Sequence, residues 1–279
     1  MSFLKNLVLC GLISFVGCQT SEKKIDNNYW KSYGKKEILA LEKKLTDKDI
    51  DLREKEFENF FRLLDSFSGK RFDLTHFHIL DKEEKNYNHW HEKAITDRDW
   101  AGLYVYGYIR NCIYVKEEYL SLDLILHEYG HFATDEIIEK SKPKNRKEAE
   151  LGNILLETLA EAFKFAAIEK IYNECEILIK PLFDHPVEFY NLNLKKKFFN
   201  ECEVYCLAAA IPFVIYYKND LKDMAAAYYF LKNSSIEKIF NDLEKTNLVE
   251  SFNSGVKKFY NSLGIKNIDA SSRLAIKNL

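Results

Sequence analysis

The amino-acid sequence predicts an α+β protein in which a small mixed sheet is followed by a mostly helical C-terminal half. Three features of the chain predict this class. Strand-like patterns are confined to residues 70–116, apolar residues recur at helical spacing on both sides of that region, and no strand-like pattern follows Leu151. A hydrophobic content of 47%, with 17 tyrosines and 20 phenylalanines among 279 residues, supports a large core.

Two helices are predicted before the sheet. Residues 36–45 and 52–67 carry apolar side chains three or four positions apart, which places them on one face of each helix. Gly69 follows the second segment and predicts its end. The residues that give the pattern are Ile38, Leu41 and Leu45, then Phe57, Phe60, Phe61 and Leu64.

Two segments predict the strands of the sheet. Residues 71–80 alternate, which puts Phe72, Leu74, His76, His78 and Leu80 on one side of a strand. Residues 101–115 are rich in Tyr, Val and Ile, and predict one or two strands with a break near Gly107 or Asn111.

The rest of the chain predicts helices. Ser121 is a suitable N-cap for the first of them. Residues 139–150 are highly charged and contain Pro143, so we expect an exposed loop there. The apolar run from Cys206 to Tyr217 contains Pro212 and is too short to cross a membrane, which favours a buried helix.

The segment from His127 to His131 reads His-Glu-Tyr-Gly-His within an apolar helical pattern. Residues four apart share a helix face, so His127 and His131 can direct both imidazoles to one point, as two corners of a tetrahedral zinc site. Glu128 lies on the same turn, where a carboxylate can take a proton from a water that zinc activates. The spacing therefore predicts zinc-dependent hydrolysis.

A second helix offers the third ligand. In residues 153–163, Glu157 and Glu161 lie four residues apart on a mostly apolar face, where a carboxylate is costly unless a positive group compensates it. Zinc would compensate Glu157, and the N–H of a ligand imidazole would compensate Glu161. The opposite order, with Glu161 as ligand, stays open, and so does a pair of solvated acids.

These two helices resemble those of the gluzincin branch of zincin metallopeptidases. The sequence HEYGH, followed by ETLAEAF, is most similar to the corresponding motifs in the catalytic domain of anthrax lethal factor and its relatives. The resemblance implies a zincin-like fold, zinc held by His127, His131 and Glu157, Glu128 as general base, and Glu161 supporting the ligands.

The same resemblance implies how substrate binds. The strand just before the zinc helix, Arg110–Val115, would border the cleft and pair with an extended peptide. This chain departs from the lethal factor pattern at Glu150, where those relatives place a tyrosine that stabilises the oxyanion. Candidates for that role lie after Glu157, where other gluzincins keep theirs: His185, Tyr190 and Tyr205.

The N-terminus predicts export. A short basic start precedes an apolar core that is too brief for a mature transmembrane helix, and it ends in Gly17-Cys18, which looks like a bacterial lipobox. Residues 1–17 would then be a lipoprotein signal peptide, with acylation of Cys18 anchoring the protein to the membrane on the periplasmic side or at the cell surface. An ordinary secretory signal is the alternative.

We expect residues 18–30 to be a polar tether and residues 31–279 to form one domain, which the resemblance implies is zincin-like. We expect helices in 31–69, strands in 70–116, the zinc-site helices in 121–170 and further helices in 171–279.

Taken together, these features predict an exported, lipid-anchored zinc metallopeptidase that hydrolyses protein or peptide substrates. The net charge of −2 gives no electrostatic basis for binding nucleic acid. A non-catalytic lipoprotein on the same scaffold, binding a protein or peptide partner, is the second hypothesis.

Overall fold

The computed structural model describes residues 34–46, 54–80, 101–105, 111–140, 146–179, 199 and 201–265. Over these residues the protein is α+β and mostly helical, with one small three-stranded sheet, which confirms the predicted class. The signal segment 1–17, Cys18 and the tether 18–30 lie outside the described residues.

Two helices precede the sheet, as predicted. α2 spans Lys35–Thr46 and α3 spans Glu58–Ser68, with a short 3-10 turn at Glu54–Phe57 between them. Gly69 ends α3 in the left-handed conformation, at φ 70°, and its N–H donates to Asp65 O. Phe60, Phe61, Leu63 and Leu64 form the buried face of α3.

The sheet contains β1 (Phe77–Leu80), β2 (Gly102–Val105) and β3 (Cys112–Lys116) in the order β1-β3-β2. β3 pairs in parallel with β1 and antiparallel with β2, so the sheet is mixed, as expected. The strand β3, which precedes the helix with the His-Glu-Tyr-Gly-His motif, is therefore central, and its prediction as the edge of a cleft is wrong. β2 is the edge strand on that side.

The prediction of one long strand over residues 71–80 is also wrong for its first half, because the strand begins only at Phe77. Asp73 accepts a hydrogen bond from Thr75 N at 3.0 Å and begins a 3-10 turn over Leu74–His76. The turn rotates the chain before β1 starts, so Phe77 is buried although the alternation put it on the other face.

Two long helices follow the sheet. α5 spans Leu122–Lys140, and Ser121 Oγ accepts a hydrogen bond from Leu124 N at 3.2 Å, which confirms the predicted N-cap. α6 spans Arg146–Cys175. The loop predicted for 139–150 is too long, because Lys, Arg and Glu are good helix formers and the charged residues from Arg146 onward continue the helix.

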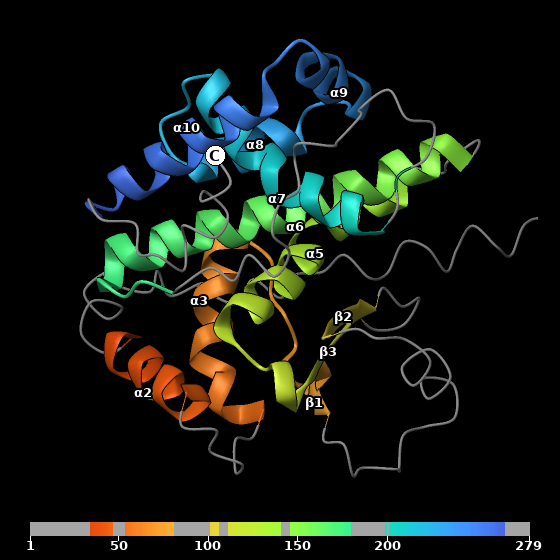
Figure 1. The fold of residues 1–279 in the computed structure, drawn as a ribbon. Coiled ribbons are helices and arrows are strands. Elements are labelled where there is room, and N and C mark those ends of the chain that lie inside the picture. Colours follow the sequence, from red (N-terminus) through yellow and green to blue (C-terminus); the bar gives the residue numbers. More distant parts are fainter. Residues whose placement is uncertain are drawn as a thin grey trace, which may run out of the picture.

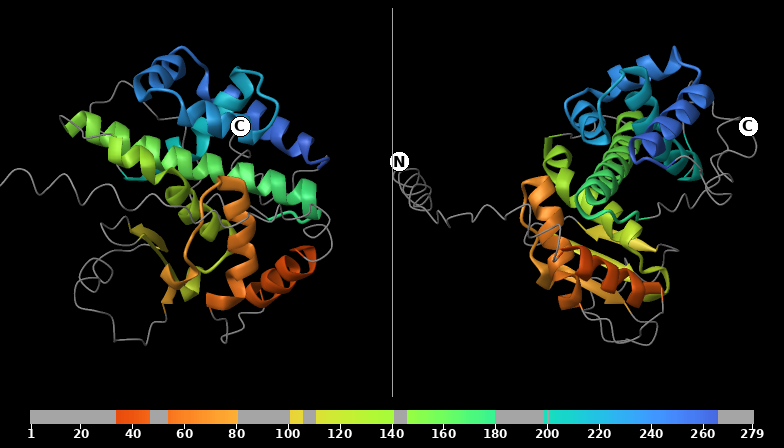
Figure 2. Two further views of the ribbon diagram at one scale, coloured as in Figure 1. Left: turned by 180° about the vertical axis from the view of Figure 1, so that it is seen from behind. Right: turned by 90° about the vertical axis from the view of Figure 1, so that its left-hand side faces the viewer.

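α6 crosses the middle of the molecule (Figure 1), with α8, α9 and α10 on one side and α3 and the sheet on the other. Figure 2 shows the same separation from two further directions. The C-terminal elements are α7 (Glu201–Lys218), α8 (Met224–Lys232), α9 (Ile236–Glu244) and α10 (Leu248–Ser262).

One hydrophobic core runs from Ile38 in α2 to Leu263 after α10. α7 contains Pro212 and is buried over most of the apolar run from Cys206, which confirms the predicted buried helix. None of the helices that the structure describes is both long and apolar enough to cross a membrane.

Candidate metal centre

α5 and α6 meet along a polar seam that carries most of the residues singled out in the sequence. The helices are antiparallel, and three pairs of side chains face each other in register along them. On each helix the members lie three or four residues apart and therefore share a face. The pairs, which we call the α5–α6 seam, are Asp123 with Lys164, His127 with Glu161, and His131 with Glu157.

Gly130 allows the two helices to approach closely enough for these pairs to form. A Cβ atom at this position would lie 2.7 Å from both Cα and the carbonyl oxygen of Ala160. Backbone atoms cannot yield as a flexible side chain can, so any larger residue would force the helices apart. The glycine in the His-Glu-Tyr-Gly-His motif thus has a packing role.

His127, His131 and Glu157 bring one potential ligand atom each to a common point. His127 Nε2 lies 3.2 Å from His131 Nε2 and 3.2 Å from Glu157 Oε2, and His131 Nε2 lies 3.5 Å from the same oxygen. In a tetrahedral zinc site with bonds of about 2.0–2.1 Å, neighbouring ligand atoms are about 3.3–3.4 Å apart. The three atoms therefore have the separations of a tetrahedral face, and the group can hold a metal ion.

The environment of Glu157 also fits a cation. Its Oε2 is buried, and among the residues that the structure describes no donor forms an aligned hydrogen bond with it. A buried carboxylate oxygen without a donor is costly unless a positive charge lies beside it. Burial alone would raise the pKa of Glu157, but the two histidines reverse this and lower it far below its usual value.

The net charge of the α5–α6 seam favours binding of a divalent cation. Asp123, Glu157 and Glu161 contribute three negative charges, and the Lys164 ammonium contributes one positive charge. With both imidazoles neutral, this buried set carries two uncompensated negative charges. One divalent cation between His127, His131 and Glu157 would balance them.

Glu161 supports His127 from behind. Its Oε1 lies 2.7 Å from His127 Nδ1, so the carboxylate accepts the Nδ1–H and leaves the Nε2 lone pair directed at the common point. Burial alone would raise the pKa of Glu161, but Lys164 and His127 lower it to about 2. Glu157 thus faces the Nε2 atoms of His127 and His131, whereas Glu161 contacts His127 Nδ1. This geometry favours the order in which Glu157 is the ligand and Glu161 supports the histidine.

Glu128 lies beside this group, buried between α5 and β2. Its carboxylate accepts a hydrogen bond from the Tyr104 backbone N–H, and burial raises its pKa. Gly102 makes room for it, because a Cβ there would lie 2.6 Å from Glu128 Oε1. The edge strand therefore fixes the carboxylate that follows the first histidine of the motif.

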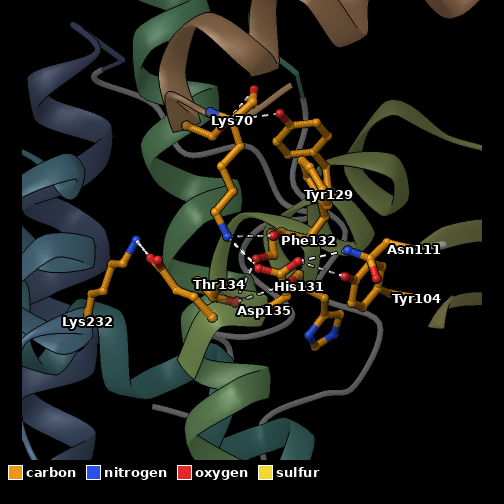
Figure 3. Close-up of polar contacts among 12 residues, drawn as sticks. Lys70, Tyr104, Asn111, Tyr129, His131, Phe132, Thr134, Asp135 and Lys232 are labelled. Carbon is orange, nitrogen blue, oxygen red and sulfur yellow. Dashed lines mark hydrogen bonds and ion pairs between the residues drawn. The ribbon is translucent and has the colours of Figure 1, made fainter. Parts of the chain in front are cut away.

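Asp135 lies one helical turn beyond His131 and joins α5 to β2 through Tyr104. It accepts hydrogen bonds from Tyr104 Oη at 3.2 Å and Asn111 Nδ2 at 2.9 Å, and pairs with Lys70 Nζ at 2.5 Å. Figure 3 shows Asp135 between Lys70 on one side and Tyr104 and Asn111 on the other. The Tyr104 ring is nearly parallel to that of His131, with centroids 6.3 Å apart.

Of the three candidates for oxyanion stabilisation, the structure describes only Tyr205. His185 and Tyr190 lie outside the described residues. Tyr205 is on α7 and 38% exposed, whereas the three residues that could hold a metal ion are on α5 and α6. Arg110, at the start of the predicted substrate strand, also lies outside the described residues.

Sequence reasoning missed four residues that surround the centre. Lys164 pairs with Glu161, and Asp123 pairs with Lys164. Tyr104 lies against His131 and Glu128, and Asp135 accepts a hydrogen bond from Tyr104. A signal for the two aspartates was present, because Asp123, His127, His131 and Asp135 recur every four residues on one helix face. Lys164 follows Glu161 by three residues, which is also a same-face spacing. Nothing local marks Tyr104.

Comparison of this chain with models of protein families, with curated proteins and with solved structures gives no significant match.

Proposed function

We propose that this protein is a zinc-dependent metallopeptidase. The observation that carries the proposal is the spacing of His127 Nε2, His131 Nε2 and Glu157 Oε2, at 3.2–3.5 Å from one another, beside the buried carboxylate of Glu128. Zinc held by these atoms would supply Lewis-acid activation of water and of a carbonyl group.

The residues around the centre have separate tasks in this proposal. Glu128 accepts the proton of the attacking water and returns it to the leaving amine, for which its raised pKa is suited. Glu161 holds His127 in the tautomer that presents Nε2. The Tyr104 amide holds Glu128 in place.

The same proposal covers the fold and substrate recognition. A mixed sheet followed by two antiparallel helices carrying His-Glu-x-x-His and a downstream glutamate supports the zincin-like assignment. Substrate pairing is assigned to β2 in place of Arg110–Val115, because β2 lies at an edge of the described sheet and contacts the base. An extended peptide on that edge would pass alongside Glu128.

The N-terminal pattern extends the proposal to location. Cleavage before Cys18 and its acylation would make this an exported lipoprotein anchored in a bacterial membrane, acting on proteins or peptides outside the cytoplasm.

The test compares two matched glutamate variants of the full chain, purified in detergent. Glu157→Gln removes the third ligand, and Glu150→Gln changes the same residue type two turns earlier on α6. We expect one zinc per chain by elemental mass spectrometry in the wild type and in Glu150→Gln, and its loss in Glu157→Gln. Hydrolysis of a fluorescently labelled unfolded protein should follow zinc content and stop with a chelator.

Two results would count against the proposal. A wild-type chain that binds no zinc when zinc is supplied, or a Glu157→Gln variant that binds it as tightly as the wild type, contradicts the metal centre. Tight zinc binding without turnover of any member of a broad peptide library favours the non-catalytic binding scaffold.

A further inference from the structure

Lys164 is a buried cation next to the metal centre. It lies in the middle of α6 with 3% of its surface exposed. Its Nζ is 3.0 Å and 2.9 Å from the two carboxylate oxygens of Glu161 and 3.4 Å from Asp123 Oδ2. A lysine ammonium taken out of water is costly to a fold, so these partners have to fix its position closely.

The contacts form a chain that ends on a metal-ligand candidate. Asp123 holds Lys164, Lys164 holds both oxygens of Glu161, and Glu161 Oε1 contacts His127 Nδ1 at 2.7 Å. The Phe165 ring adds a further contact, with its centroid 5.1 Å from Nζ. Both ends of this chain of contacts are on α5, at Asp123 and His127, so Lys164 and Glu161 together connect two successive turns of α5.

We propose that Lys164 is a positioning residue for the metal centre and acts through Glu161. The lysine fixes the carboxylate in the orientation in which Oε1 meets His127 Nδ1, and this orients the imidazole so that Nε2 points at the metal. The inference rests on the proposed metal site and adds a residue to it that the ligand motif does not include. Without the ammonium, Glu161 can rotate away and the imidazole gains rotational freedom.

The test measures zinc affinity by competition with a chelating dye, using the full chain in detergent. Lys164→Met keeps the length of the side chain and removes the charge. We expect its zinc dissociation constant to rise by about 10–100-fold, the range typical when a partner behind a ligand is lost. Lys170→Met is the control, because Lys170 lies on the same helix but is half exposed and pairs with Glu174. It should bind zinc as the wild type does.

A double-variant cycle tests the route through Glu161. Glu161→Gln alone should weaken zinc binding, and Lys164→Met in that background should weaken it little further, because both changes disable the same contact. If the two substitutions reduce zinc affinity by independent factors that multiply in the double variant, Lys164 does not act through Glu161. Asp123→Asn loosens the lysine without removing it and should weaken zinc binding in the same direction, which keeps the test valid if Lys164→Met does not fold.

The outcomes separate this inference from the proposed function. If the wild type binds zinc tightly and Lys164→Met binds it equally well, whatever its melting temperature, Lys164 is only structural and the inference is overturned. If the wild type binds no zinc, the metal site itself fails.

Discussion

Two carboxylates contact the two nitrogens of the same imidazole, since Glu161 Oε1 lies 2.7 Å from His127 Nδ1 and Glu157 Oε2 lies 3.2 Å from His127 Nε2. A neutral imidazole has only one N–H to donate. When Nδ1 donates to Glu161, the Nε2 lone pair faces the lone pairs of Glu157, and His131 Nε2 faces it as well. A proton or a cation between these atoms would relieve that repulsion.

Substitution of the base should separate metal binding from turnover. Glu128→Gln keeps the shape of the side chain and can still accept from the Tyr104 N–H, but it cannot take a proton. We expect unchanged zinc content and a fall in kcat of about 10²–10⁴-fold. Zinc analysis and peptide hydrolysis on the same preparation check this, and turnover at the wild-type rate would remove Glu128 from the mechanism.

The packing of α5 on α6 should be sensitive to a single methyl group. Gly130→Ala puts a Cβ 2.7 Å from the backbone of Ala160, so we expect a loss of about 1–3 kcal/mol in the free energy of unfolding, together with weaker zinc binding. Gly152→Ala is the matched control in α6, where a Cβ meets nothing within 4 Å. That variant should gain up to about 1 kcal/mol from helix propensity. Equal stability of the two variants in denaturant titrations contradicts the close approach.

The parts of this centre that follow from helix periodicity were predictable from the sequence. His127 with His131, and Glu157 with Glu161, are related by the four-residue repeat, which is local and does not depend on the rest of the fold. The helix that ends at Gly69 and the cap at Ser121 are local for the same reason.

Contacts that depend on pairing order were not predictable in this way. β3 became the central strand because it pairs with β1 as well as β2, and no pattern within residues 110–115 encodes its neighbours. The hydrogen bond between Tyr104 and Glu128, and the three donors that meet at Asp135, likewise join segments far apart in the chain.

The position of Glu128 should depend on the absence of a side chain at Gly102 in β2. Gly102→Ala would place a Cβ 2.6 Å from Glu128 Oε1 and 3.0 Å from its Cγ. The carboxylate has to move, whereas His127, His131 and Glu157 are on α5 and α6 and should keep their positions. We expect peptide hydrolysis to fall by at least about tenfold. Zinc affinity should stay within a few-fold of the wild-type value, and loss of zinc in this variant would show that β2 supports the ligands as well.

The protonation of His127 should make zinc binding depend on pH in the neutral range. Burial alone would lower the pKa of His127, but the carboxylates of Glu157 and Glu161 outweigh it and raise that pKa well above its usual value near 6.5. In the metal-free protein the extra proton therefore stabilises the folded state. That contribution is complete below about pH 6.5, where the unfolded chain is also protonated, and it is lost as the pH rises through the folded-state pKa.

Zinc and this proton compete for the same nitrogen, so their effects on stability have opposite slopes. Between pH 6.5 and the folded-state pKa, zinc affinity should increase by up to about tenfold per pH unit, while the metal-free protein becomes less stable. The low pKa values of Glu157 and Glu161 add no slope there, because both groups titrate in acid. Melting temperatures with and without zinc across this range measure the effect, and a zinc-induced shift that does not change with pH contradicts the assignment of His127 as a ligand.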